Sequence, residues 1–501
     1  MSAKTLMVVG SMSSSGKSLL VAALCRIYAR RGYKVAPFKA QNMSNNAAVC
    51  ADGSEIGRAQ ALQALAAGIE PEVCMNPVLI KPEADSYSQV ILMGKPWSHL
   101  HASNFYQKKA QLWKAIPPAL EELRNRHDLV IIEGAGSPVE LNLKQGDIVN
   151  MAVAKLANAP TLLVGDIDRG GIFAQLLGTL WLLEEDERSL IKGLVINKFR
   201  GDRSLFNDGI KLMEEKAGVP VLGVLPWLKD LGLPEEDAAS LDTYRHDKSF
   251  LDRQNLDIAV IKLPRIANFD DFDPLRAESG LQLRFLEDID KFAYPDAVIL
   301  PGTKSTRADL QWLEQTGLAA KLRDYAAKGG CVVGICGGYQ MLGESIEDPH
   351  QVESNAPAVS GLGLLPLRTV FSEQKSACQT QAQVCHGQQW LAGMEGQSLF
   401  GYEIHNGQTS SSSPWLKYFR EKSPATPVFD GAISPDAKIW GCYLHGLFAN
   451  QNLRHAWLKS LDWKATPRES LKNPLEKSLD TLADAVEQNL DIELLDKIIW
   501  G

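Results

Sequence analysis

Short apolar runs alternate with amphipathic segments along most of the chain. In the first half, the apolar runs predict β-strands at residues 5–10, 33–38, 129–133, 161–166, 193–197 and 219–225. Amphipathic stretches such as 17–31 and 105–126 predict helices between them. Such alternation is typical of a parallel sheet that helices cover on both faces. The run 129–132 is apolar throughout, which fits a strand that is buried on both sides.

The second half repeats this pattern after a break. The break is rich in charge and proline, and apolar runs resume at 258–263, 297–300 and 331–335. We therefore predict an α/β protein with two doubly wound domains. The predicted parts are an N-terminal domain over 1–232, a linker over 233–255, a second domain over 256–455 and a helical C-terminal tail over 456–501.

Composition narrows the class of protein. The chain has 501 residues and a formal net charge of −8, with scattered basic residues, which argues against a nucleic-acid surface. No apolar run approaches the roughly 20 residues of a membrane helix, so we expect no membrane partner. The eight cysteines contain no Cys-x-x-Cys pair, which favours a reduced, cytoplasmic protein. A zinc site at Cys378, Cys385 and His386 remains an alternative that needs a fourth ligand.

A glycine- and serine-rich loop follows the first predicted strand and opens a helix. It runs GSMSSSGKS from Gly10 to Ser18, with five residues between its glycines. Strand, loop and helix in this order are typical of a phosphate-binding loop, whose amides form an anion site at the helix N-terminus. We expect Lys17 to reach the phosphates of ATP and Ser18 to ligate Mg²⁺. The other ATP-binding candidates are Gly10, Ser13, Ser15 and Gly16.

Polar residues also follow the other predicted strands of this domain. Glu133 ends one strand and is a candidate ligand of Mg²⁺, and Asp166 and Asp168 end the next. Asn197 follows a further strand and is a candidate for reading the purine of ATP. All four lie where ligands bind in open α/β sheets, at the carboxyl ends of the strands.

A polar loop over residues 39–46 is a candidate substrate site. It is dense in amide and hydroxyl groups, which can hold a ligand bearing carboxylates and amides. We expect Lys39, Gln41, Asn42 and Ser44 to contact such a substrate.

In the second domain, the stretch GICGGYQMLG over residues 334–343 predicts a strand, a sharp turn and a helix. The turn places Cys336 at a helix N-terminus, which favours its thiolate form. His445 ends another apolar run and is a candidate base for this nucleophile. The amides of Gly302 and Gly337 are candidates for an oxyanion hole. His405 is a third candidate, for substrate binding or for structure.

The two predicted sites together point to amide synthesis. A carboxylate resists attack until ATP converts it to an acyl phosphate with a good leaving group. The attacking nucleophile must be NH₃, because ammonium has no lone pair. A Cys-His site can release that NH₃ from glutamine, so one chain would supply both reactants.

Several motifs resemble known families. GICGGYQMLG and the later YLHGLF resemble class I glutamine amidotransferases, whose fold is flavodoxin-like, and GKS with EGAGS resembles dethiobiotin-synthetase-like ATPases. Further motifs make the chain resemble the cobyric acid synthases over about residues 5–455: FKAQNMSNNA, EIGRAQALQA, MNPVLIKP, QVILMGKP, GDIDRGGIFAQ and ILPGTKST.

The resemblance implies a reaction on a corrinoid substrate. The b, d, e and g carboxylates of adenosylcobyrinic acid a,c-diamide are amidated with ATP and glutamine, giving adenosylcobyric acid. By position, Cys336 is the nucleophile and His445 its base. Many triad amidotransferases carry Glu two residues after this histidine, where Leu447 stands here, so the site is a dyad or borrows an acid such as Glu403.

The resemblance also implies an aspartate that helps to hold Mg²⁺ in the first domain. That position falls near Gln60 in this chain, so Asp52 or Glu55 is the candidate substitute.

Two alternatives differ in what they predict. The related cobyrinic acid a,c-diamide synthase performs the same chemistry at two other carboxylates. A partitioning ATPase with an inactive amidotransferase domain usually has a lysine after the first loop glycine, where Ser11 stands here.

Overall fold

The computed structural model describes residues 2–84, 86–228, 231–234, 255–353, 357–418, 427–464 and 474–501. The chain forms two compact units. Unit 1 comprises Met1–Ser44, Glu55–Pro234 and Lys472–Gly501, and unit 2 comprises Asn45–Ser54 and Glu235–Leu471. Most of the predicted linker 233–255 lies outside the described residues.

A six-stranded parallel sheet forms the centre of unit 1 and confirms the predicted α/β class. The strand order is β12-β11-β10-β1-β9-β2, and every neighbouring pair is parallel. The bounds are Lys4–Gly10 for β1, Val35–Phe38 for β2, Leu129–Glu133 for β9, Thr161–Asp166 for β10, Ile191–Phe199 for β11 and Val221–Pro226 for β12. All six predicted strands are therefore present. Their continuous apolar runs fit a parallel sheet that helices cover on both faces.

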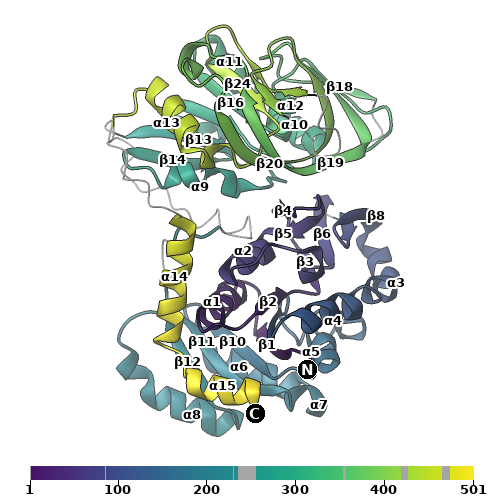
Figure 1. Cartoon of the computed structure of the whole chain (residues 1–501), viewed down its shortest axis with the longest axis vertical. Coiled ribbons are helices and arrows are strands. Elements are labelled where there is room, and N and C mark those ends of the chain that lie inside the picture. Colours follow the sequence, from purple (N-terminus) through teal and green to yellow (C-terminus); the bar gives the residue numbers. More distant parts are fainter. Residues whose placement is uncertain are drawn as a thin grey trace. The chain divides into compact units, whose positions relative to one another are not determined.

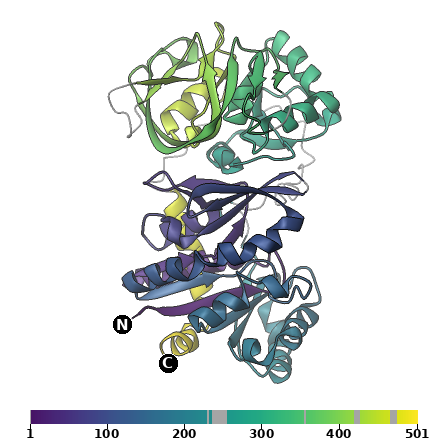
Figure 2. The same cartoon turned by 90° about the vertical axis from the view of Figure 1, so that its right-hand side faces the viewer.

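Helices lie on both sides of this sheet (Figure 2). Their bounds are Lys17–Arg30 for α1, Arg58–Ala66 for α2, Ala102–Trp113 for α3, Ile116–Arg126 for α4, Met151–Ala157 for α5, Ile172–Leu182 for α6, Glu185–Arg188 for α7 and Asn207–Ala217 for α8. The single helix predicted over 105–126 is thus two helices. The break precedes Pro117 and Pro118, which lack the backbone N–H of a helix interior and fit a first turn.

Unit 1 also has a smaller sheet that the sequence did not predict. Its order is β3-β6-β7-β8, with bounds Gln41–Met43, Val78–Ala84, Tyr87–Leu92 and Lys95–His101. The strand β3 belongs to the polar loop over 39–46, so part of the candidate substrate loop is extended backbone.

The C-terminal helices α14 (Pro474–Glu487) and α15 (Ile492–Trp500) belong to unit 1. In Figure 1, α14 (yellow) runs alongside α1. Leu482 is buried in the same apolar cluster as α1, and Arg26 of α1 pairs with Asp480 at 2.8 Å. The end of the chain therefore completes the core around the helix that begins at Lys17.

Shortening Leu482 to alanine should lower the free energy of unfolding of unit 1 by about 2–5 kcal/mol, because it leaves a cavity against α1. Calorimetry of the full chain should show a lower midpoint for one transition. Thr481 is exposed on the same helix, and Thr481→Ala is the matched control that should leave the midpoint nearly unchanged. Equal midpoints for Leu482→Ala and the unmodified protein would contradict this packing.

Unit 2 contains a second six-stranded sheet in the order β14-β13-β15-β16-β24-β23. The bounds are Leu256–Ile261 for β13, Leu281–Leu286 for β14, Ala297–Leu300 for β15, Cys331–Ile335 for β16, Ala432–Ile433 for β23 and Ile439–Cys442 for β24. All pairs are parallel except β23 with β24. The five parallel strands follow the 2-1-3-4-5 order of the flavodoxin-like fold, as predicted.

The helices of unit 2 and a second sheet enclose this core. The helix bounds are Asp273–Arg276 for α9, Thr306–Gln315 for α10, Leu318–Ala327 for α11, Gly337–Met341 for α12 and Gln451–Ser460 for α13. The second sheet contains β17 (Ser345–Glu347), β18 (Ala358–Ser360), β19 (Arg368–Val384), β20 (Ser398–Ser410), β21 (Leu416–Tyr418) and β22 (Val428–Asp430). Trp415, Trp440 and Trp457 are fully buried and pack edge to face. Within the part of the chain that the structure describes, no helix is long and apolar enough to cross a membrane.

Candidate functional site

Cys336 lies on a sharp turn between strand β16 and helix α12. Its backbone φ is 50°, a left-handed conformation that is uncommon outside glycine, and it caps the N-terminus of α12. Gly338 makes the turn possible, because a Cβ there would lie 2.0 Å from the carbonyl oxygen of Leu300. The structure therefore has the strand–turn–helix geometry that the sequence predicted for this cysteine.

His445 and Cys336 come together as predicted, and a carboxylate lies behind the histidine. The Nδ1 atom of His445 is 2.6 Å from Oδ2 of Asp271, while Oδ1 of Asp271 accepts a hydrogen bond from the Gly446 amide at 2.8 Å. His445 also interacts with the Cys336 sulfur. The side chains of His445 and Asp271 are almost completely buried. This cysteine, histidine and aspartate have the order of contacts of a catalytic triad.

Burial and two neighbouring groups determine the charge of His445. Burial disfavours the imidazolium, but the Asp271 carboxylate and the Cys336 sulfur outweigh burial and raise the pKa of His445 to about 10. The imidazole is consequently protonated at neutral pH. A protonated His445 beside Cys336 can act as a proton donor at this site.

Replacing Asp271 with asparagine should lower the pKa of His445 by about 1–3 pH units, because an adjacent opposite charge is removed. In the predicted glutamine hydrolysis, a protonated His445 passes its proton to the leaving ammonia, so the alkaline limb of the pH profile should move to lower pH. The exposed Asp290 provides the control variant Asp290→Asn. An unchanged alkaline limb in Asp271→Asn would show that this carboxylate does not set the pKa.

Gly302 and Gly337, the candidate oxyanion donors, lie around the same centre. A Cβ on Gly302 would be 2.9 Å from Cε1 of His445, and a Cβ on Gly337 would be 2.7 Å from Cγ2 of Thr303. The loop after β15 therefore contacts both the histidine and the first turn of α12. Gly337 is the first residue of that helix, where amides have no intrahelical acceptor.

Glu403 is not the acid beside His445. Its carboxylate accepts a hydrogen bond from Tyr418 and lies 3.1 Å from Nε2 of His405, whose ring stacks on Tyr443. Glu403, which is fully buried, thus belongs to a separate polar cluster with His405. The acid that fills the missing position is Asp271, which is 174 residues from His445 in the sequence.

In unit 1, the predicted phosphate-binding loop connects β1 to α1. Gly16 has φ 94° and precedes Lys17, the first residue of the helix. The Lys17 ammonium donates to the carbonyl oxygens of Met12 and Gly136, both at 3.1 Å. The hydroxyl oxygen of Ser15 is fully buried and has no hydrogen-bond partner among the described residues. A cation and an unsatisfied hydroxyl on one loop suit an anionic ligand.

The remaining residues of this loop are positioned by close contacts. A Cβ on Gly10 would lie 2.3 Å from Oγ of Ser15 and 2.9 Å from Nζ of Lys17. A Cβ on Gly136 would be 3.8 Å from Oγ of Ser13. Gly10 therefore lets the loop fold back over the end of its strand.

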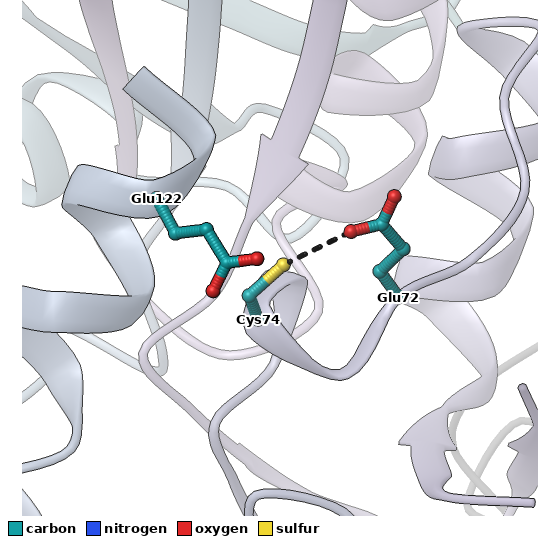
Figure 3. Close-up of side chains that lie close together, drawn as sticks. All are labelled: Glu72, Cys74 and Glu122. Carbon is teal, nitrogen blue, oxygen red and sulfur yellow. Dashed lines mark hydrogen bonds between the residues drawn. The ribbon is translucent and has the colours of Figure 1, made fainter. Parts of the chain in front are cut away.

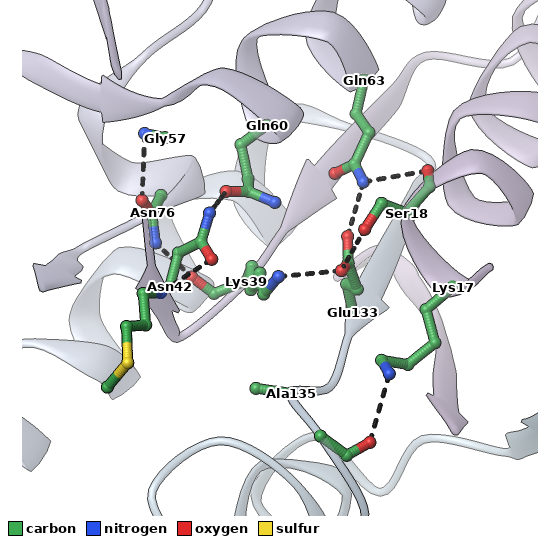
Figure 4. Close-up of polar contacts among 12 residues, drawn as sticks. Lys17, Ser18, Lys39, Asn42, Gly57, Gln60, Gln63, Asn76, Glu133 and Ala135 are labelled. Carbon is green, nitrogen blue, oxygen red and sulfur yellow. Dashed lines mark hydrogen bonds and ion pairs between the residues drawn. The ribbon is translucent and has the colours of Figure 1, made fainter. Parts of the chain in front are cut away.

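Glu133 is the centre of a polar network at the end of β9 (Figure 4). Its carboxylate accepts hydrogen bonds from Ser18 at 2.8 Å and Gln63 at 2.6 Å, and pairs with Lys39 at 2.9 Å. Burial acts to raise the pKa of Glu133, but the Lys39 ammonium and the two hydrogen bonds keep it below its usual value. Glu133 is therefore ionised.

The donor set around Glu133 fits Mg²⁺. Magnesium is bound by hard oxygen ligands, usually one or two carboxylates together with phosphate oxygens and water. The Ser18 hydroxyl and the Glu133 carboxylate lie within 2.8 Å of each other, beside the phosphate-binding loop. Lys39 contacts the same carboxylate, so this predicted substrate residue is also a neighbour of the candidate metal site.

The other candidate carboxylates of unit 1 are paired with basic residues. Asp166 lies 2.9 Å from Nζ of Lys198, and Asp168 lies 2.6 Å from Nε of Arg200. Asn197, the candidate purine reader, donates to the Ser15 carbonyl at 2.9 Å and so contacts the phosphate-binding loop from β11.

The candidate substrate residues are mostly buried. Asn42 donates to Gln60 at 2.8 Å, as Figure 4 shows, and the Ser44 amide donates to the Ile80 carbonyl at 3.0 Å. The Oε1 atom of Gln41 is buried without a hydrogen-bond partner in the described part of the chain.

The two candidate substitutes for the missing metal aspartate bond to other residues. Asp52 accepts hydrogen bonds from Ser54, and Glu55 pairs with Lys81 at 2.6 Å. The position near Gln60 is instead followed by Gln63, which does contact Glu133.

One further group has the composition of a metal site. Among the described residues, one group of three potential metal ligands has all its ligand atoms within 4.8 Å of one another. It consists of Glu72, Cys74 and Glu122 (Figure 3). Arg126 donates to Glu72 at 3.1 Å, and burial with the nearby Glu72 raises the pKa of Cys74 to about 12, so its thiol is neutral. A guanidinium and a neutral thiol do not suit a cation. The zinc site considered for Cys378, Cys385 and His386 does not form such a cluster.

Sequence reasoning missed Asp271 and Gln63. Asp271 follows strand β13 within the segment Asn268-Phe269-Asp270-Asp271, and an acid near the carboxyl end of a strand is the only signal it offers. Gln63 faces Glu133 from α2. It lies within the motif EIGRAQALQA, but the motif alone does not show which of its residues contacts Glu133.

Comparisons with known proteins agree with this architecture. Residues 6–240 match the CobQ/CobB/MinD/ParA nucleotide binding domain, and residues 257–453 match the CobB/CobQ-like glutamine amidotransferase domain. The chain is therefore an amidotransferase ligase that joins a nucleotide-binding domain to a glutamine amidotransferase domain.

Full-length relatives narrow the class to one family. A cobyric acid synthase of Chloroflexus aurantiacus is 54% identical over 100% of both chains, and one of Roseiflexus castenholzii is 53% identical over 97% of both. Another, of Dehalococcoides mccartyi, is 48% identical over 99% of both. This chain belongs to the cobyric acid synthase family.

Proposed function

We propose that the chain amidates the b, d, e and g carboxylates of adenosylcobyrinic acid a,c-diamide with ATP and glutamine, giving adenosylcobyric acid. The observation that carries the proposal is the identity of about half of all residues, over the whole chain, with proteins named cobyric acid synthase. The phosphate-binding loop and the Cys336–His445–Asp271 arrangement supply the two chemistries that such a reaction requires.

In the proposed glutamine reaction, the Cys336 thiolate attacks the carboxamide carbon of glutamine. The developing oxyanion accepts hydrogen bonds from the amides of Gly302 and Gly337, each worth about 3 kcal/mol in comparable sites. The pKa of His445 is about 10, so the imidazole is protonated at neutral pH and gives its proton to the departing nitrogen. Ammonia leaves and a thioester forms. Water then attacks the thioester, His445 takes a proton, and glutamate is released.

In the proposed synthetase reaction, an oxygen of the corrinoid carboxylate attacks the γ-phosphorus of ATP and ADP leaves. Ammonia then attacks the acyl carbon of the resulting acyl phosphate, so a C–N bond forms and phosphate departs. Each amide thus consumes one ATP and one glutamine. Lys17 neutralises phosphate charge during the transfer, and Mg²⁺, held by Ser18 and Glu133, would supply further positive charge.

The proposed ATP site comprises Gly10, Ser13, Ser15, Gly16, Lys17 and Ser18, with Asn197 contacting the loop from β11. For the corrinoid, we propose Lys39, Gln41, Asn42 and Ser44. Lys39 is supported by its position, because its ammonium lies 2.9 Å from Glu133 and can attract a substrate carboxylate to the phosphate-transfer site. Gln41 is supported by its amide oxygen, which has no hydrogen-bond partner among the described residues and can accept one from a side-chain amide of the substrate.

Turnover of purified protein tests this proposal. Adenosylcobyrinic acid a,c-diamide is incubated with ATP, Mg²⁺ and glutamine, and the corrinoid is analysed by mass spectrometry. We expect a product with four additional amides and four ADP per corrinoid. Addition of two amides to the fully acidic corrinoid would instead identify a cobyrinic acid a,c-diamide synthase, and no amide on either corrinoid would refute both.

A further inference from the structure

A short segment from the first part of the chain is folded into unit 2. Residues Asn45–Ser54 lie within the region matched by the nucleotide-binding family, yet they pack with unit 2. Their centre is the strand β4 (Ala47–Val49), which is buried, and Asn46 is 1% exposed. A buried amide side chain requires hydrogen-bond partners. Hydrogen bonds of Asn46 and of the nearby Val49 carbonyl lead to the candidate catalytic histidine along two routes.

The first route passes through Asn268. The Asn268 amide donates to Oδ1 of Asn46 at 2.6 Å, and Oδ1 of Asn268 accepts from the Ala47 amide at 2.9 Å. Asn268 has φ 53° and begins the short turn that carries Asp271, whose amide donates to the Asn268 carbonyl at 3.1 Å. These two hydrogen bonds between Asn46–Ala47 and Asn268 therefore fix Asn268 in its positive-φ conformation. Asn268 begins the turn whose Asp271 contacts His445.

The second route passes through the β19–β20 pair. Nε2 of Gln379 donates to the Val49 carbonyl at 2.5 Å, and Gln379 is the direct cross-strand partner of Tyr402. The Tyr402 ring stacks on His445 with a centroid distance of 5.0 Å, and the backbones of these two residues exchange hydrogen bonds of 2.9 and 3.2 Å. The segment is therefore bonded to the elements on both sides of the imidazole.

We propose that the segment Asn45–Ser54 positions the Asp271–His445 pair, with Asn46 as its main positioning residue. This inference rests on the proposed glutamine reaction. Asn46 touches neither glutamine nor the reacting atoms; it acts by holding Asn268, and through it the Asp271 carboxylate, against Nδ1 of His445. Displacing that carboxylate weakens both the orientation and the protonation of the imidazole.

The test compares Asn46→Ala with Asn45→Ala in the full-length protein. Asn45 is the adjacent residue of the same type, and its Oδ1 has no hydrogen-bond partner among the described residues. For Asn46→Ala, we expect kcat of glutamine-dependent amidation to fall about tenfold with little change in KM for glutamine, because buried hydrogen bonds are lost. Amidation with ammonium chloride should stay within about twofold. Asn45→Ala should retain both activities.

A second readout separates positioning from general loss of structure. The rate of Cys336 alkylation by iodoacetamide is measured against pH. In both Asn46→Ala and Asp271→Asn, the alkaline part of this profile, where His445 loses its proton, should move to lower pH. A merely structural defect would lower activity without moving it. Gln379→Leu, at the second route, serves if Asn46→Ala fails to fold.

The outcomes distinguish this inference from the proposed function. Unchanged glutamine-dependent kcat and an unchanged alkylation profile in Asn46→Ala, or in Gln379→Leu if that variant is used, would overturn the positioning role. An equal loss of glutamine-dependent and ammonia-dependent activity would also overturn it. If the unmodified protein adds no amide to the corrinoid, the proposed function itself fails. If glutamine-dependent amidation survives in Cys336→Ala, the proposed glutamine reaction fails.

Discussion

Cys336→Ala should abolish glutamine-dependent amidation, with a fall of about a thousandfold or more, while amidation with a high concentration of ammonia survives. Removal of the nucleophile of a catalytic unit typically costs this much or more, because the remaining members cannot replace it. The proposed site of acyl phosphate formation lies in unit 1, so externally supplied ammonia should need no thiolate. The measurement is the rate of corrinoid amidation with either nitrogen donor.

A second cysteine provides a matched control for this variant. Cys331 begins the same strand β16, and burial raises its pKa to about 12, so it remains a neutral thiol in the core. Cys331→Ala should therefore keep its use of glutamine. Loss of both glutamine- and ammonia-dependent activity in a folded Cys336→Ala protein would contradict the division of labour between the two units.

The parallel sheets could be predicted from the sequence because their strands are marked locally. A strand such as 129–133 is buried on both faces and must be apolar along its length, so it stands out without any knowledge of its neighbours. Cys336 and Lys17 were also predictable, since each lies at a strand–turn–helix junction with glycine next to it. In such junctions local geometry and chemistry coincide.

Asp271 could not be predicted in the same way. Its role depends on the segment after β13 reaching His445, which follows β24, although β15 and β16 lie between these two strands in the sheet. Many triad amidotransferases carry the acid two residues after the histidine, and that expectation led only to Leu447 and to Glu403. The latter has the right chemistry, but its carboxylate is directed to Tyr418 and His405.

The second sheets were missed for a related reason. Strands β19 and β20 are long, but β19 is polar and rich in glutamine, because both of its faces include exposed positions. Its continuity comes from pairing with β20 along most of its length, which is a tertiary property. The same holds for Asn46, which belongs to the predicted polar loop over 39–46 and makes a buried contact with Asn268 in the fold.

Lys17→Ala should remove amidation with both nitrogen donors, each by about a hundredfold or more, since it deletes a cation directed at transferred phosphate. Lys17 is only 6% exposed and is held by the carbonyls of Met12 and Gly136 at 3.1 Å, so its ammonium is fixed beside the loop before ATP arrives. Without it, acyl phosphate formation slows, and ammonia from either source finds no activated carboxylate. ADP release and corrinoid amidation are measured together.

This variant should leave the amidotransferase centre intact, which makes its result specific. Cys336 should still be alkylated by iodoacetamide at the unmodified rate, because the thiolate depends on His445 and Asp271 in unit 2. Lys192→Ala, which removes an exposed lysine of β11, controls for the loss of one positive charge from unit 1 and should keep both activities. Ammonia-driven amidation at the unmodified rate in Lys17→Ala would refute the assignment of this lysine to phosphate transfer. If Lys17→Ala loses ammonia-dependent amidation and Cys336→Ala keeps it, the two variants separate the activation of the carboxylate from the supply of nitrogen.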